Sequence, residues 1–451
     1  MTKIDDLSLT FRLTKKYVRF TFKRFYSKHI ILGSENIPAQ GPVIFAPNHL
    51  NALMDALAVH SATPDNYSTI FLARSDMFRK KIVADFLTFA KIMPAFRIRD
   101  GFEHLGKNNE VFEKCVEVLE RGNTMGIMPE GNQELENRIR PLVKGIFRVA
   151  FAAQQKIGTD KTVKIIPVGL DYGSFVKSQS HIIINFGEAI DIVDYMADYD
   201  ENPVLATNKL RDDLRQKMGE LVLNLDSNDN YTSFEQATKL SNLSVLRNLK
   251  LDKTITNLFL VRQQIAKKLL ALENDNPKLT KELNGLNNEF IQLKEKHKLH
   301  EANFELKHQS FAKDLISTFA FCVLTPVFLI GLLLNFFPFF IPVWVRKQLK
   351  VKFEGFFTSL QYGIGIITFP LFYLLQSILI VQISTFSSWY ILALLPLHYF
   401  SGKWAIKIYK HFRKFIGAKA HKRLMRKNPK LSLKTNELRS RIIEIVQNQF
   451  T

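Results

Sequence analysis

Two long tracts without charge constrain the fold of this chain most strongly. No charged side chain occurs between Leu315 and Val345, or between Gly355 and Gly402. A helix that crosses a bilayer needs about 20 predominantly apolar residues. We therefore expect an all-α transmembrane region over residues 311–402. A buried helix of a soluble protein is the alternative, and uncharged runs of this length argue against it.

The basic residues around these tracts predict their orientation. Basic side chains separate the two tracts, and residues 403–430 contain 11 lysines and arginines and no acidic residue. Cytoplasmic segments carry such an excess. The N-terminal domain, the connector and the tail can all be cytoplasmic only if each tract enters the membrane and returns. We therefore expect two helical hairpins, either fully spanning or re-entrant, with reversals near Pro338 and Pro342 and near residues 382–385. Three single spans are the alternative.

The net charge of the chain points to a negatively charged partner. The chain has 62 basic and 42 acidic residues and a net charge of +20. The basic tail, residues 403–451, is expected to attract anionic membrane lipid at about 1 kcal/mol for each residue near the surface. Nucleic acid is the competing partner for this charge, and the adjacent apolar tracts argue against it.

The N-terminal segment, residues 1–34, contains a predicted basic amphipathic helix at 7–26. Phenylalanines recur there at helical spacing with lysines and arginines between them. Such a helix can lie in the headgroup layer of a membrane. An ordinary helix packed on the following domain is an equally good interpretation.

Residues 35–225 are predicted to form an α/β domain. Short apolar strands at 42–46, 69–73, 124–128, 164–168 and 181–186 alternate with helical stretches at 52–61, 79–90, 108–121 and 144–156. This alternation indicates a mainly parallel sheet with flanking helices. Motifs at the ends of parallel strands meet at one edge, where ligands bind.

Residues 226–310 are predicted to form a helical hairpin or a short coiled coil. Apolar residues recur there at three- and four-residue steps among many charges. The two cysteines, Cys115 and Cys322, lie far apart. They exclude a disulfide framework and a cysteine zinc site, and they fit a reducing compartment.

A histidine follows the first strand of the α/β domain, with an aspartate six residues later. His49 comes directly after the Pro47-Asn48 pair, and Asp55 lies on the first turns of the next predicted helix. A catalytic imidazole needs a partner that fixes its tautomer and stabilises its cation. Asp55 could fold back and supply that carboxylate, although such a pair also arises by chance.

Three further motifs lie in the same predicted domain. Arg97 and Arg99 could hold a phosphate through paired hydrogen bonds, or lie in a solvated loop. Glu130 is presented at a strand end, where Gly131 lets the backbone turn closely past a ligand. Glu130 could accept hydrogen bonds from substrate hydroxyls, orient the phosphate-binding arginine, or be an ordinary turn residue. Pro167 marks where a buried strand leaves the sheet, and it is expected to shape a pocket wall.

Together these four segments resemble the glycerol-phosphate acyltransferase family of membrane-bound phospholipid-synthesis enzymes. The family's blocks are a His-Asp block, a block ending in arginine, a Pro-Glu-Gly block and an apolar proline block. All four occur in order over roughly residues 35–190. Five residues separate His49 from Asp55 instead of the common four. This spacing, with Asn51 inside it, resembles the branch with fungal glycerol-3-phosphate and dihydroxyacetone-phosphate acyltransferases.

The resemblance implies roles for the matching residues. His49 matches the general base that deprotonates the acceptor hydroxyl, and Asp55 matches the carboxylate that orients it. Arg99 matches the arginine that binds the acceptor phosphate, with Arg97 as a helper. The remaining matches are implied substrate-binding or pocket residues, namely Asn51, Glu130, Gly131 and Pro167.

The implied reaction is direct transfer of a fatty acyl group from a thioester to glycerol 3-phosphate, with the catalytic domain on the cytoplasmic face. The donor would be acyl-CoA or acyl carrier protein, with no metal and no bound cofactor. Lysophosphatidate and dihydroxyacetone phosphate are alternative acceptors. A catalytically inactive lipid-binding scaffold and a metal-dependent hydrolase are alternatives from other classes.

Overall fold

The computed structural model describes residues 8–95, 105–304, 311–384 and 387–450. The chain divides into two compact units. The first unit comprises residues 1–224 together with 351–359, and the second comprises residues 225–350 and 360–451. The short segment 351–359 thus belongs to the N-terminal unit, although it lies far along the chain.

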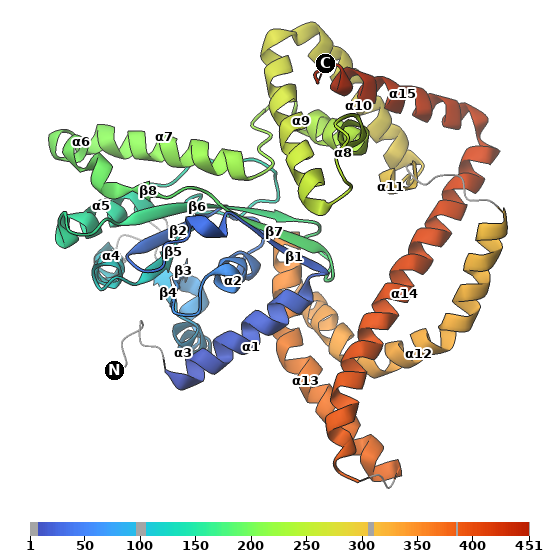
Figure 1. Cartoon of the computed structure of the whole chain (residues 1–451), viewed down its shortest axis with the longest axis horizontal. Coiled ribbons are helices and arrows are strands. Elements are labelled where there is room, and N and C mark those ends of the chain that lie inside the picture. The colour runs from blue at the N-terminus through green and yellow to red at the C-terminus, as the bar shows by residue number, and fades with distance from the viewer. Residues whose placement is uncertain (1–7, 96–104, 305–310, 385–386, 451) are drawn as a thin grey trace. The chain divides into compact units, whose positions relative to one another are not determined.

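The first unit is built on an eight-stranded sheet with the order β1-β7-β6-β2-β5-β3-β4, and β8 pairs with β6 (Figure 1). The strands are β1 (Lys28–Leu32), β2 (Val43–Pro47), β3 (Ile70–Arg74), β4 (Ile92–Ala95), β5 (Thr124–Gly126), β6 (Lys164–Tyr172), β7 (His181–Phe186) and β8 (Ile190–Asp191). Among the described strands, only the pairs of β6 with β7 and with β8 are antiparallel. The predicted mainly parallel α/β sheet is confirmed, and β1 and β4 are additions to it.

Helices cover both faces of this sheet. Side chains alternate between the faces along β2, as they must in a strand. Ile44 and Ala46 join a buried cluster with α4 (Leu105–Glu120), α5 (Gly145–Ile157) and α7 (Pro203–Leu221). Phe45 packs on the other face, where its ring contacts those of Tyr67 and Phe186. That second face carries α1 (Leu9–Phe25) and α2 (Leu53–Ala62), while α3 (Lys81–Phe89) lies beside β4 and α6 (Met196–Glu201) precedes α7.

Helix α1 is anchored to the first unit by one of its lysines. The ammonium of Lys15 is buried and donates hydrogen bonds to the backbone carbonyls of Pro64, Asp65 and Tyr67, which follow the end of α2. The opposite side of α1 leaves apolar side chains exposed, namely Leu9, Leu13, Tyr17 and Phe20. One face of α1 is therefore packed on the domain, as in the second interpretation of this helix, and another is open.

The second unit contains a bundle of four helices, α8 (Tyr231–Asn248), α9 (Ile255–Asp275), α10 (Pro277–Lys296) and α15 (Pro429–Gln447). A short helix, α11 (Glu301–Phe304), follows α10. Helix α15 buries Leu438 and Ile442, and Arg441 pairs with Glu282 of α10 at 2.9 Å. Residues expected to form a separate hairpin or coiled coil thus share one bundle with the end of the predicted basic tail.

The uncharged tracts form long helices, α12 (Phe311–Gln348), α13 (Phe357–Ser384) and the start of α14 (Tyr390–Lys427). Two of the described helical stretches, Leu315–Gln348 and Glu354–Ser384, are long and apolar enough to cross a membrane. The first tract differs from the expected hairpin because α12 continues through Pro338 and Pro342. A proline removes one backbone hydrogen bond and bends a helix. The helix can nevertheless continue on both sides of the proline.

Candidate active site

The site begins where β2 leaves the sheet. The side chain of Asn48 extends the pairing of β2 with β6, because its Oδ1 accepts from Leu170 N at 2.7 Å and its Nδ2 donates to Leu170 O at 3.2 Å. An amide side chain can thus replace a backbone peptide in the ladder. Asn48 fixes the point from which the next residue, His49, leaves the sheet.

His49 and Asp55 are in direct contact. The distance from His49 Nδ1 to Asp55 Oδ2 is 2.8 Å, and the Asp55 side chain is fully buried in the first turn of α2. The same carboxylate oxygen accepts from Leu50 N at 2.9 Å and from Asn51 N at 2.7 Å. Ala52 has φ 45° and ψ −120°, a conformation that L residues rarely adopt and that is often found at functional sites. Residues 49–52, called the histidine loop below, therefore wrap around one carboxylate.

Tyr172 completes the shell of Asp55. Its hydroxyl donates to Asp55 Oδ1 at 2.7 Å, so both carboxylate oxygens are hydrogen-bonded. Burial, and then the nearby Asp55 charge, raise the pKa of Tyr172 well above its ordinary value, so the phenol keeps its proton. Tyr172 ends β6, the strand beside β2, and no motif in the sequence marks it strongly as a site residue. The pairing of β6 with β2 is the signal that could have found it.

These contacts leave one nitrogen of His49 available for chemistry. With its Nδ1 proton donated to Asp55, the neutral imidazole has an unprotonated Nε2. Nε2 has no hydrogen-bond partner among the described residues, and the His49 side chain is 21% exposed. An imidazole whose tautomer is fixed by a buried carboxylate, with a free and accessible Nε2, can accept a proton from a bound hydroxyl.

Glu130 lies behind the histidine loop and does not face solvent. Its side chain is 1% exposed, and its carboxylate accepts from His49 N at 3.1 Å and from Arg140 Nη2 at 2.5 Å. Burial raises the pKa of Glu130, while the charge of Arg140 acts in the opposite direction. The loop after β5 folds back over this carboxylate and brings Arg140 against it.

Arg140 is a site residue that sequence analysis missed. Residues 130–142 form a loop that returns to its start, where Val143 N donates to Pro129 O at 2.7 Å. This closure brings Arg140 against Glu130. Gly131 occupies the first turn of the loop with φ 68°, and a Cβ there would lie 3.1 Å from Val143 Cγ1. Glu130 and Arg140 are ten residues apart. The pattern of strands and helices in the sequence does not show that the loop brings them together.

The remaining predicted residues differ in how the structure places them. Asn51 is fully buried, and its Oδ1 accepts from Thr358 Oγ1 at 2.9 Å. Pro167 is buried inside β6, where it is paired with Ala46 of β2, so it supports the sheet below the histidine loop. Arg97 and Arg99 lie outside the described residues.

The buried cysteine of the first unit is not suited to act as a nucleophile. Cys115 belongs to the core cluster on α4 and is 1% exposed. Burial raises the pKa of its thiol to about 12, so the thiol stays protonated at neutral pH. The thiolate is the reactive form.

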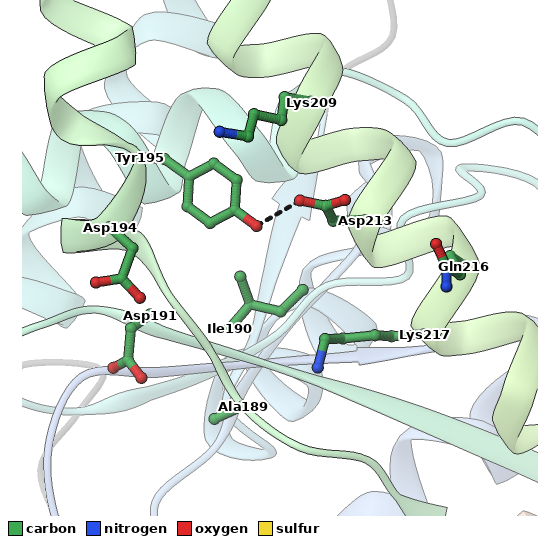
Figure 2. A pocket seen from close by; sticks show the side chains of 9 residues that line it. All are labelled: Ala189, Ile190, Asp191, Asp194, Tyr195, Lys209, Asp213, Gln216 and Lys217. Carbon is green, nitrogen blue, oxygen red and sulfur yellow. Dashed lines mark hydrogen bonds between the residues drawn. The ribbon is translucent and has the colours of Figure 1, made fainter.

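A hollow elsewhere in the first unit is lined by charged side chains of β8, α7 and the segment between them (Figure 2). Tyr195 donates to Asp213 at 2.6 Å in this hollow (Figure 2). None of the residues of the histidine site lines it. The hollow is therefore distinct from the candidate active site.

Comparison with known proteins identifies relatives of this unit. The acyltransferase family model matches residues 29–171. Glycerol-3-phosphate O-acyltransferase 1 of Saccharomyces cerevisiae is 33% identical over 82 residues, which are 18% of this chain and 11% of that protein. A chloroplastic 1-acyl-sn-glycerol-3-phosphate acyltransferase of Brassica napus is 21% identical over 46% of this chain and 55% of that protein. The chain therefore matches only part of either relative.

Two further comparisons name the same kind of protein. The 1-acyl-sn-glycerol-3-phosphate acyltransferase of Borreliella burgdorferi is 28% identical over 41% of this chain and 67% of that protein. The crystal structure of the 1-acyl-sn-glycerophosphate acyltransferase of Thermotoga maritima covers 40% of this chain and 68% of its own, with 20% identity and a TM-score of 0.31. Residues 29–171, which hold the histidine loop, Asp55 and Glu130, thus match the acyltransferase family model, and the relatives named above are acyltransferases.

Proposed function

We propose that this protein is a membrane-bound O-acyltransferase that moves a fatty acyl group from a thioester to a hydroxyl of glycerol 3-phosphate. The observation that carries the proposal is the contact of His49 Nδ1 with the buried Asp55 carboxylate, which leaves Nε2 accessible. The family match and the names of the relatives support an acyl transfer to a glycerol phosphate.

The reaction follows from this geometry. His49 Nε2 takes the proton of the acceptor hydroxyl as the oxygen attacks the thioester carbonyl. The new C–O bond forms a tetrahedral intermediate, which collapses when the C–S bond breaks. The proton held by His49 passes to the departing thiolate, so the imidazole returns to its neutral form. A positioned base of this kind supplies about 10²- to 10⁴-fold in rate.

Asp55 acts on the imidazole and not on the substrate. Its carboxylate fixes the His49 tautomer and stabilises the imidazolium that forms during transfer. Glu130 and Asn51 are buried and bonded to protein groups, so we assign them to support of the histidine loop. By the family resemblance, Arg99 with Arg97 is assigned to the phosphate of the acceptor.

The membrane has a physical role in this proposal. Long acyl chains and the acylated product partition into lipid, so the site is best held at the bilayer surface. Two apolar helical stretches, Leu315–Gln348 and Glu354–Ser384, suit attachment to a bilayer. The basic residues of the C-terminal tail suit anionic lipid on the cytoplasmic face, where we place the catalytic unit.

A lysophosphatidate is the second candidate acceptor. It is favoured by the relatives from Brassica napus and Borreliella burgdorferi, which carry that specificity in their names and align over 46% and 41% of this chain. Both acceptors share a phosphate and a free hydroxyl, so the same base serves either reaction.

An acceptor panel tests the proposal. Purified protein in anionic-lipid vesicles is incubated with labelled palmitoyl-CoA and glycerol 3-phosphate, dihydroxyacetone phosphate or lysophosphatidate. Transfer is expected fastest to glycerol 3-phosphate and unaffected by chelator. Preference for lysophosphatidate supports the second candidate. Absence of transfer to all three, from palmitoyl-CoA or from palmitoyl acyl carrier protein, contradicts the proposal, and loss of activity with chelator points to a metal-dependent enzyme.

A further inference from the structure

The segment between the two candidate spans belongs to the first unit. Residues 351–359 follow α12, contain the short 3-10 helix Glu354–Phe356 and end in the first residues of α13. They are separated from the rest of the first unit by 126 residues of the second unit, 225–350. Contacts with the histidine loop tie segment 351–359 to the first unit.

Two hydroxyls of this segment bond to one residue of the histidine loop. Thr358 Oγ1 donates to Asn51 Oδ1 at 2.9 Å, and Ser359 Oγ donates to Asn51 O at 3.1 Å. Thr358 is fully buried and Ser359 is 8% exposed. A buried acceptor that loses its donor costs stability, so these bonds favour a single position of Asn51.

The backbone of the segment also approaches the loop closely. A Cβ on the buried Gly355 would lie 2.3 Å from Gln133 Nε2 and 3.0 Å from Leu50 O. Gln133 Nε2 itself donates to Leu50 O at 3.1 Å. A side chain at position 355 would therefore displace Gln133 from Leu50 O and press on the histidine loop.

The polar groups of the histidine loop bond to three sets of partners, namely Asp55, the loop after β5 and segment 351–359. The N–H groups of Leu50 and Asn51 point to Asp55, and that of His49 points to Glu130. The Leu50 carbonyl is held by Gln133, and the carbonyl and side chain of Asn51 are held by Ser359 and Thr358. Asp55 and the loop that contains Glu130 and Gln133 thus hold one part of the histidine loop, and segment 351–359 holds the carbonyl and side chain of Asn51.

We propose that segment 351–359 keeps the histidine loop in the conformation that aims His49 at the substrate, with Thr358 and Ser359 as positioning residues. The inference rests on the proposed acyl transfer for its functional meaning. It also makes the connector of the apolar helices a working part of the active site.

Paired substitutions test this role. Thr358→Val removes the hydroxyl at nearly constant volume, and we expect kcat to fall about 10- to 100-fold with KM for both substrates unchanged, because small displacements of a catalytic group have effects of this order. Thr358→Ser should restore most of the rate. Thr325→Val is the matched control, because the Thr325 hydroxyl bonds only to Phe321 O of its own helix at 2.7 Å.

A second readout does not depend on turnover. Amide hydrogen exchange of a peptide covering residues 48–55 should become faster in Thr358→Val and in Ser359→Ala, and should stay unchanged in Thr325→Val. Wild-type rates of both turnover and exchange in folded Thr358→Val would overturn the inference, and Ser359→Ala decides if Thr358→Val does not fold. If the wild-type protein transfers no acyl group, the proposed function fails, while the exchange data still decide whether the segment holds the loop.

Discussion

At the scale of single residues, the site depends on how completely Asp55 is satisfied. Its two oxygens accept from His49 Nδ1, two backbone N–H groups and the Tyr172 hydroxyl, all at 2.7–2.9 Å. A buried carboxylate with four donors stays in one orientation and remains a good acceptor. The imidazole takes its orientation from this carboxylate.

Tyr172→Phe should therefore slow catalysis without unfolding the protein. Loss of a hydrogen bond to a charged group costs about 1.5–3 kcal/mol, and only part of this reaches the His49 contact, so we expect kcat to fall about 10-fold. Tyr195→Phe is the matched control, because it removes a tyrosine–aspartate bond in the hollow of Figure 2. Equal kcat in wild type and Tyr172→Phe would show that Asp55 does not need this donor.

The sequence predicted the centre of the site better than its surroundings. The contact between His49 and Asp55 follows from a strand end and the first helical turn, which are both local features. Tyr172 and Arg140 reach the site through strand order and through a loop that closes on itself, and neither leaves a periodic signal. Thr358 is 307 residues from Asn51, so no local pattern connects them.

At the scale of elements, the strongest strands and helices were predictable, and weakly patterned ones were not. Strands β2, β3, β5, β6 and β7 and helices α2, α3, α4 and α5 fall at the expected places. Strands β1 and β4 lie at the two edges of the sheet, and β4 contains Pro94, so neither shows the long apolar run of a central strand. Helix α15 carries charged side chains on one side, so its sequence was assigned to the basic tail. Its buried apolar side was therefore not predicted.

The anchoring of α1 by Lys15 gives a pH-dependent prediction. Burial, as the largest cause, lowers the pKa of Lys15 to about 8 from 10.5. Between these two values the unfolded chain binds a proton that the folded protein does not, so the Lys15 contribution to stability rises with pH in this window. Below about 8 the ammonium is charged in both states, and the contribution is constant.

Wild type and Lys15→Met should therefore differ more in Tm at pH 9.5 than at pH 7, in favour of the wild type. Lys16→Met provides the control, because Lys16 is exposed on the same helix. Thermal unfolding at both pH values measures the difference. If the advantage in Tm of the wild type over Lys15→Met became smaller as the pH rises, the lowered pKa assigned to Lys15 would be contradicted.

At the scale of the whole molecule, the connector of the apolar helices constrains topology. Residues 351–359 belong to the same compact unit as the catalytic sheet, and a bilayer cannot divide such a unit. The described residues before α12 contain no candidate span. Both ends of α12 are then expected on the catalytic side, with its three prolines, Pro326, Pro338 and Pro342, allowing the helix to bend within the membrane.

Cysteine labelling in sealed vesicles tests this sidedness. Cys322 is first replaced by serine, and a single cysteine is introduced at Lys352 in the connector or at Lys161 in the catalytic unit, both of which are exposed. A membrane-impermeant maleimide should label the two positions from the same side. Ser387→Cys, between α13 and α14, should be labelled from the other side. Labelling of Lys352→Cys opposite to Lys161→Cys would show that α12 crosses the bilayer.

The central claim is that His49 Nε2 is the base for acyl transfer, and one comparison tests it most directly. The initial rate of transfer from palmitoyl-CoA to the preferred acceptor is measured for wild type and His49→Ala in the same vesicles, with Tm recorded for both. We predict a loss of about 10²- to 10⁴-fold in kcat at unchanged Tm and unchanged membrane insertion. Transfer by folded His49→Ala at the wild-type rate would contradict the account.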